Sequence, residues 1–234
     1  MPRLALLFLA ACIACAADDS EDSKAKEALN AFAKAYASKD ETARASAVSA
    51  LGEVEHPRVV HVLGSLLTSD AESIRVAAAQ ALGKFHGRKD VVPALTEALA
   101  SEEKYPKAEV AILRALGETG DPAAVPALRK HLKSEVPKRD KDDGSSEKAA
   151  IDALEKLHCK ASLEALIETL KQNALAGGTS GKGQGTARKS REEVKQATTR
   201  AIESLTGEKL DSWREWEDWW KATSSKYDDQ LSKK

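Results

Sequence analysis

The segment DAESIRVAAAQALG, which runs from Asp70 to Gly83, is the stretch of sequence that decides the fold. Alanine is the strongest helix former, so this alanine-rich segment predicts a helix. Its last six residues, AAQALG, return in related form as AVSALG (47–52), ILRALG (112–117) and the weaker AIDALE (150–155). A phrase that recurs at a nearly constant spacing indicates a repeat protein.

A second phrase follows each copy of the first. It begins at Val60, Val92, Val125 and Leu163, so successive copies are 32, 33 and 38 residues apart. In every copy a leucine follows three and seven residues later, which places three apolar side chains on one helical stripe. One helix pair cannot cover its own stripe, and a period of this size is typical of a solenoid of stacked helix pairs.

Glycine and proline mark the expected ends of the helices. Gly52, Gly83 and Gly117 stand where the first helix of a repeat must stop, and we expect each to form a left-handed C-terminal cap. Pro57 and Pro122 suit the first turn of the second helix, where a missing N–H costs nothing.

Composition agrees with this architecture. Aromatic residues make up only 4% of the chain while the wider hydrophobic set makes up 42%, so alanine and leucine carry the apolar content. This composition favours closely packed helices and disfavours a β-sandwich. We therefore predict an all-α fold, an α-solenoid in which antiparallel helix pairs stack into a right-handed superhelix. The net charge of −1 does not favour nucleic acid as a partner.

These phrases resemble HEAT repeats, which belong to the armadillo-like class, and above all the short repeats named after phycobilin lyases. The closing unit, with Leu205-Thr206-Gly207 and the tryptophans after it, resembles that of exported bacterial HEAT-repeat proteins. The resemblance implies a ladder of acidic residues and arginines between repeats, at Asp40 with Arg44 and at Asp70 with Arg75. The ladder is interrupted in the third and fourth repeats, where glutamate replaces the arginine.

The N-terminal residues have the pattern of a secretory signal peptide, which we predict over residues 1–17. Arg3 supplies the positive end, residues 4–11 form a short apolar core, and Ala14-Cys15-Ala16 is a small-x-small cleavage pattern. The apolar run is too short to span a membrane. We expect an exported protein, either periplasmic or extracellular.

A lipidated N-terminus remains an alternative. Residues 9–12 read Leu-Ala-Ala-Cys and resemble a bacterial lipobox, in which Cys12 would carry the lipid. The protein would then be anchored to a membrane without any change in fold. Cleavage after Ala16 would instead leave Cys159 as the one cysteine, so no intramolecular disulfide is expected.

The rest of the chain fits around the repeats. The predicted segments are a capping helix over 20–38, four HEAT-like repeats over 40–173 with a charged insertion at 134–147, a glycine-rich basic linker over 174–190, a degenerate fifth repeat with a tryptophan-rich cap over 191–221, and a disordered tail over 222–234.

Two surfaces are candidate binding sites. The first is the side of the second helices that points away from the core, which helical geometry assigns to His61, Ser65, Glu97, Lys130, Lys133, Glu168 and Lys171. The second is the set Trp213, Trp216, Trp219 and Trp220, which either caps the last repeat or leaves indoles exposed as an aromatic platform.

Patterns that support chemistry are missing. The run from Gly177 to Gly183 lacks the first glycine and the Ser/Thr of a phosphate-binding loop, and no strand precedes it. His158 and Cys159 are adjacent, so they point in different directions on a helix, and His131 stands alone in sequence. We expect no catalytic, metal or cofactor site and no cofactor.

Binding is the function that remains. We expect a monomeric, non-enzymatic scaffold or adaptor whose partner is another protein, with membrane contact only if Cys12 is lipidated. The alternative is a structural accessory subunit of an envelope assembly. A cofactor lyase of the phycobilin-lyase type is suggested only by the name of the repeat.

Overall fold

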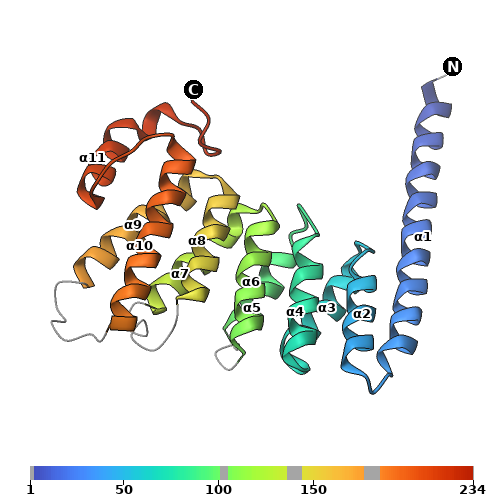
Figure 1. Ribbon diagram of the computed structural model, residues 1–234. Coiled ribbons are helices and arrows are strands. Elements are labelled where there is room, and N and C mark those ends of the chain that lie inside the picture. Colours follow the sequence, from blue (N-terminus) through green and yellow to red (C-terminus); the bar gives the residue numbers. More distant parts are fainter. Residues whose placement is uncertain (1–2, 101–104, 136–143, 177–184, 234) are drawn as a thin grey trace.

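The computed structural model of the protein describes residues 3–100, 105–135, 144–176 and 185–233 (Figure 1). Over these residues the chain forms eleven α-helices and two short 3₁₀ helices. In chain order they are α1 (Arg3–Tyr36), α2 (Glu41–Leu51), α3 (Pro57–Ser69), α4 (Glu72–Gly83), α5 (Val91–Leu99), α6 (Pro106–Glu118), η2 (Pro122–Ala124), α7 (Val125–Glu135), α8 (Ser145–Leu157), α9 (Lys160–Ala176), α10 (Gly185–Thr206), α11 (Trp213–Thr223) and η3 (Ser224–Lys226).

The helices stack in two layers. The first helices of the repeats, α2, α4, α6, α8 and α10, each pack on the next, and the second helices α3, α5, α7, α9 and α11 form the other layer (Figure 1). Within the described ranges the one β feature is an isolated bridge between Tyr227 and Lys233. The prediction of an all-α solenoid is confirmed.

The core runs between the two layers along the length of the molecule. Leu63, Leu95, Leu128 and Leu166 hold the same position in successive second helices, and each is fully buried. All four side chains belong to one cluster of buried residues that extends through every repeat, so the repeats share one continuous core.

The glycines of the repeated phrase do not act as left-handed caps, and this prediction was wrong. Gly52 follows α2 with φ −67° and ψ −3°, Gly83 is the last residue of α4, and Gly117 lies within α6. Left-handed glycines occur elsewhere, at Gly87 and Gly120 for example.

Close packing is the reason for glycine in the repeated phrase. A Cβ atom at Gly52 would lie 2.5 Å from the Cβ of Ala81, and one at Gly117 would lie 2.5 Å from the Cα of Ala153. The contacts follow one rule along the array: Gly52 with Ala81, Gly83 with Ala115, and Gly117 with Ala153. The phrase Ala-Leu-Gly therefore supplies both partners, since its glycine faces the alanine of the next copy.

The N-terminal helix α1 covers the open end of the first repeat. It begins at Arg3, so the helix that we expected over 20–38 is the last part of a longer one. Leu29, Phe32 and Tyr36 are partly buried against the core, and the rings of Phe32 and Tyr36 lie 4.8 Å apart. Searched over the described residues, none of the helices is long and apolar enough to cross a membrane.

The C-terminal tail is folded over residues 222–233, which corrects the prediction of disorder for this part of 222–234. Tyr227 and Leu231 are each only 7% exposed, because Tyr227 packs on the rings of Trp219 and Trp220. The backbone N–H of Lys160, at the start of α9, donates to the carbonyl of Asp229 at 3.0 Å. Two buried apolar side chains thus hold the otherwise polar tail in place. The tail also accepts a hydrogen bond from a backbone N–H at the start of α9, which has no partner within that helix.

The predicted insertion and linker are shorter than expected. Helix α7 extends to Glu135 and α8 begins at Ser145, while α9 extends to Ala176 and α10 begins at Gly185. Helices therefore take residues from both ends of each predicted loop. Residues 136–143 and 177–184, which include the whole phosphate-loop-like run from Gly177 to Gly183, lie outside the described residues.

The glycine–alanine contacts predict a sharp effect of one methyl group. Gly117→Ala should lower the free energy of unfolding by about 1–3 kcal/mol, because the new Cβ overlaps the backbone of Ala153. Gly64→Ala is the control: Gly64 also lies in a helix, but its Cβ would meet Ala94 at an ordinary 3.5 Å. Gly64→Ala should raise the free energy of unfolding by up to about 1 kcal/mol, because alanine has a higher helix propensity than glycine. Urea unfolding measures both, and a Gly117→Ala variant as stable as wild type would contradict the packing rule.

Candidate functional site

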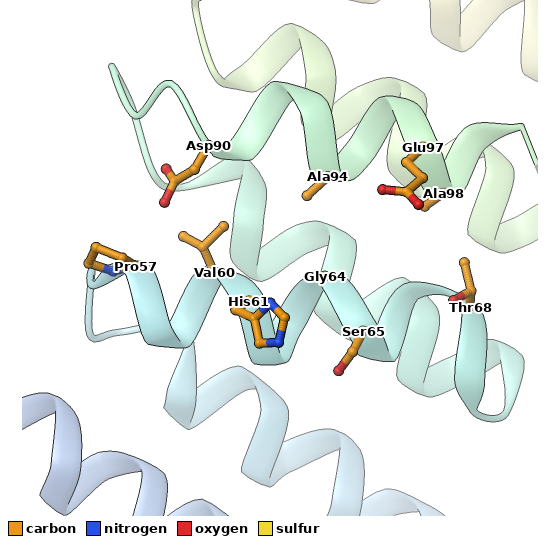
Figure 2. A pocket seen from close by; sticks show the side chains of 10 residues that line it. All are labelled: Pro57, Val60, His61, Gly64, Ser65, Thr68, Asp90, Ala94, Glu97 and Ala98. Carbon is orange, nitrogen blue, oxygen red and sulfur yellow. The ribbon is translucent and has the colours of Figure 1, made fainter.

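Three of the predicted surface residues line one pocket. His61, Ser65 and Glu97 lie around a hollow of about 390 Å³ between α3 and α5, on the outer side of the second-helix layer (Figure 2). All three residues are exposed. The volume falls in the range of about 300–1,000 Å³ that is usual for ligand pockets. We name this hollow the α3–α5 pocket.

Small residues create the pocket. Gly64 on α3 faces Ala94 on α5, and neither has a side chain that could fill the space between the helices (Figure 2). Val60 and the buried Ala98 add apolar surface. The middle of the pocket is therefore apolar and narrow.

Carboxylates stand at both ends of the pocket. Asp90, just before α5, is held by Arg88, whose Nε and Nη2 atoms donate to its two oxygens at 3.0 and 2.9 Å. These hydrogen bonds keep the pKa of Asp90 below its ordinary value, although burial opposes the shift. Glu97 at the other end is exposed and forms no ion pair with any residue that the structure describes.

The other predicted surface residues lie farther along the same face, where ion pairs bridge the second helices. Arg129 and Lys133 on α7 both pair with Glu168 on α9, with 2.9 Å between Lys133 Nζ and the carboxylate. Burial raises the pKa of Glu168, but its two cationic partners outweigh this and lower the pKa.

The bridging continues to the last helix. Lys171 on α9 pairs with Glu217 on α11 at 3.1 Å and lies 5.0 Å from the ring centre of Trp213. The hydrogen bond from Lys171 lowers the pKa of Glu217. Lys130 on α7 is exposed. The predicted surface thus divides into the open α3–α5 pocket and a bridged half from α7 to α11.

The tryptophans pack mainly as a cap. Trp216 is fully buried and Trp220 is 8% exposed, and the indole N–H of Trp220 donates to Glu164 on α9 at 3.2 Å. Trp213 and Trp219 are partly buried against the core. Trp213 also has the guanidinium of Arg214 4.9 Å from its ring centre. Trp213 and Trp219 thus keep part of their surface exposed, while Trp216 and Trp220 cover the last repeat.

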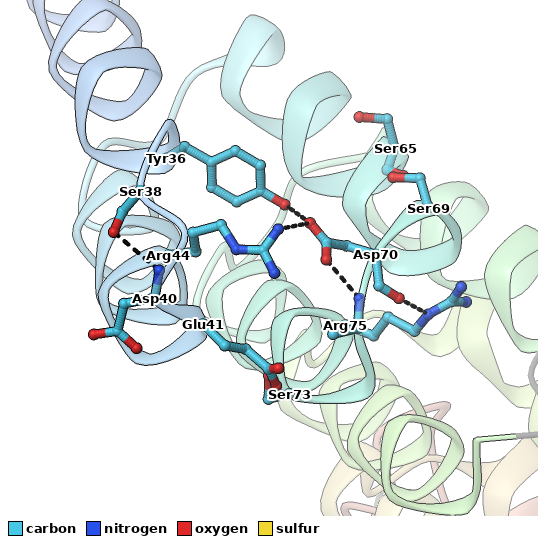
Figure 3. A network of polar contacts seen from close by, with 11 residues as sticks. Tyr36, Ser38, Asp40, Glu41, Arg44, Ser65, Ser69, Asp70, Ser73 and Arg75 are labelled. Carbon is cyan, nitrogen blue, oxygen red and sulfur yellow. Dashed lines mark hydrogen bonds and ion pairs between the residues drawn. The ribbon is translucent and has the colours of Figure 1, made fainter.

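A polar network ties the first repeats together at the C-terminal end of α3 (Figure 3). Tyr36 on α1 donates a hydrogen bond to Asp70, and Arg44 on α2 pairs with the same carboxylate at 3.1 Å. Burial raises the pKa of Asp70, but the hydrogen bonds from Tyr36 and from the Ala71 N–H, together with the charge of Arg44, lower it overall.

The ladder implied by the resemblance to HEAT repeats uses the expected residue types, but the pairs differ from those expected. Arg44 pairs with Asp70 of the following repeat, not with Asp40. Arg75 donates instead to the backbone carbonyls of Leu67, Thr68 and Asp70 at 2.6–3.1 Å. The guanidinium of Arg75 therefore caps the C-terminal end of α3.

The structure also brings together His131 and Glu109, a polar pair that the sequence did not reveal. His131 on α7 is buried, and its Nδ1 atom lies 3.7 Å from Glu109 on α6. Glu109 occupies the position that the ladder arginine has in the first two repeats. This departure from the repeat pattern was the sequence signal that could have indicated a different partner here. Across the described residues no group of three or more His, Cys, Asp and Glu side chains could hold a metal ion.

The opposite face of the molecule also has a hollow. It lies on the first-helix layer, has a volume of about 800 Å³, and includes Gln80 on α4 and Arg114 on α6. Both of these side chains are exposed. This hollow provides a comparison for experiments on the α3–α5 pocket.

The two-layer stack of helix pairs defines an α-solenoid, a class that presents extended surfaces for protein binding. The family model of HEAT repeats matches residues 9–82 and 62–143, more than half of the chain. The chain belongs to the HEAT-repeat family. A search of curated proteins gave no match. Helices α8 to α11 lie beyond the matched residues and continue the same stacking.

The network predicts a contribution of Tyr36 to stability at alkaline pH. Burial and the hydrogen bond to Asp70 raise the pKa of Tyr36 from 10.0 to about 12. The fold thus favours the protonated phenol of Tyr36. The contribution of this phenol to the free energy of unfolding is therefore complete below pH 10 and is lost as the pH rises from 10 to about 12. Tyr36→Phe should lose less unfolding free energy than wild type over that interval. Urea unfolding at several pH values tests this, and parallel decreases would contradict it.

Proposed function

We propose that the protein is a non-enzymatic scaffold, exported to the cell envelope or exterior, which binds another protein along its second-helix face. One observation carries this proposal. The α3–α5 pocket leaves that face open between α3 and α5, whereas ion pairs close it from α7 to α11. An open pocket is a better place for a partner to dock than a surface that ion pairs already bridge.

Rigid presentation would be the mechanism. The shared core and the glycine–alanine contacts hold α3 and α5 in fixed positions, so docking would require little rearrangement of this chain. Most of the affinity would come from a few side chains around the pocket. HEAT-repeat proteins are in general scaffolds without enzymatic activity, which supports a role in binding.

Export rests on the sequence of the first residues. A positive end, an apolar core and a small-x-small pattern at Ala14-Cys15-Ala16 favour removal of a signal peptide. The proposal places the mature repeats outside the cytoplasm, where the partner would be found.

A pair of matched double variants tests the binding face. Ser65→Arg with Lys130→Glu changes two exposed positions on the second helices α3 and α7. The control, Gln80→Arg with Arg114→Glu, makes changes of the same charge on the first helices α4 and α6. The wild-type protein should retain a specific protein from envelope extract, identified by mass spectrometry. The control variant should retain it equally, and the second-helix variant should retain at least about tenfold less.

Two results would contradict the binding proposal. One is that the wild-type chain retains no protein above an unrelated bait. The other is that the control variant loses the partner while the second-helix variant keeps it, which would place binding on the opposite hollow.

Processing of the N-terminus tests export. Mass spectrometry of the mature protein from fractionated cells should show a chain that begins after Ala16, in the periplasm or medium. Cys12→Ser should leave this processing unchanged. Incorporation of labelled palmitate that disappears in Cys12→Ser would show a lipoprotein instead, and an intact Met1 in the cytoplasm would refute export.

A further inference from the structure

The α3–α5 pocket and the ion-paired region between α7 and α9 occupy equivalent positions. Each lies between the second helices of two successive repeats. Val60 and Val125 begin the buried stripes of α3 and α7, and Val92 and Leu163 begin those of α5 and α9. Counting from these residues gives each position in one helix a counterpart in the other. The two regions can therefore be compared side chain by side chain.

Between α7 and α9, two cations of the chain itself bridge the helices. Arg129 and Lys133 stand four and eight residues after Val125, and both reach across to Glu168, five residues after Leu163. The aliphatic parts of their side chains can cover the surface between the helices, and their charged ends meet the carboxylate.

Between α3 and α5 the carboxylate is present but the cations are not. Glu97 stands five residues after Val92, in the position of Glu168. The counterparts of Arg129 and Lys133 are Gly64 and Thr68, and both line the pocket. The hollow is thus the space that two long basic side chains would occupy, and an acidic residue still faces it.

We propose that the α3–α5 pocket binds an arginine or lysine side chain of the partner protein. This inference rests on the proposed function and specifies the chemistry of the partner. The alkyl part of the side chain would lie over Val60, Gly64 and Ala94, and its charged end would pair with Glu97. Arginine fits best, since its guanidinium can donate two parallel hydrogen bonds to one carboxylate. Asp90, at the other end of the pocket, is already paired with Arg88, so Glu97 is the carboxylate that the pocket offers to a cation.

A short peptide tests this without knowledge of the partner. Acetyl-Ala-Ala-Arg-Ala-Ala-amide would be titrated into the full ¹⁵N-labelled chain, with the peptide in which citrulline replaces arginine as the neutral control. The arginine peptide should shift the amide resonances of Gly64, Ser65 and Glu97 in a saturable way. The citrulline peptide should bind at least about tenfold more weakly, because it lacks the charge.

Variants of the chain sharpen the test. Glu97→Gln removes the charge, and Thr68→Lys supplies from the chain itself the cation that Lys133 supplies in α7. Both positions are exposed, so both variants should fold, and each should reduce binding at least about tenfold. Glu208→Gln, at an exposed position in the loop before α11, is the matched control and should bind as wild type does.

The outcomes separate this inference from the proposed function. Equal binding of the two peptides, or unchanged binding by Glu97→Gln and Thr68→Lys, would overturn the inference. A captured partner that depends on Ser65 and Lys130 but is indifferent to Thr68→Lys would also overturn it, while the scaffold proposal would stand. Loss of both the partner and the arginine peptide in Thr68→Lys would support it.

Discussion

The contact between a glycine of one first helix and an alanine of the next sets the spacing of the first helices from α2 to α8. Gly52 on Ala81 and Gly117 on Ala153 leave no room for a further methyl group. The first helices therefore approach one another as closely as their backbones allow. This fixes the relative placement of the second helices that the same repeats carry, and with it the surface that they present.

The second-helix layer has room for variation because its helices contact one another less extensively than the first helices do. Between α7 and α9, Arg129, Lys133 and Glu168 fill the surface with ion pairs, while between α3 and α5 Gly64 and Ala94 leave a pocket. One backbone arrangement thus carries a closed region and an open one. The difference depends on side chains that contribute little to the core, so it can be changed without loss of the fold.

The ends of the array are closed by different means. At the N-terminal end, α1 packs on the first repeat, and Tyr36 shares the carboxylate of Asp70 with Arg44. At the C-terminal end, the buried Trp216 and the ordered tail cover the last repeat, with Tyr227 against the indoles. Both ends need such a cover because a terminal repeat of a solenoid has no neighbour on one side to bury its apolar surface.

The sequence by itself determined the class of fold, the helix pairs and the buried stripe, because an apolar period such as that of Val60 and Leu63 is a local property of a helix. It also placed His61, Ser65 and Glu97 on one face. Only the tertiary structure decided what those residues meet. The role of the glycines, the ion pairs of Glu168 and the order of the tail depend on contacts between residues far apart in the chain, which no local pattern records.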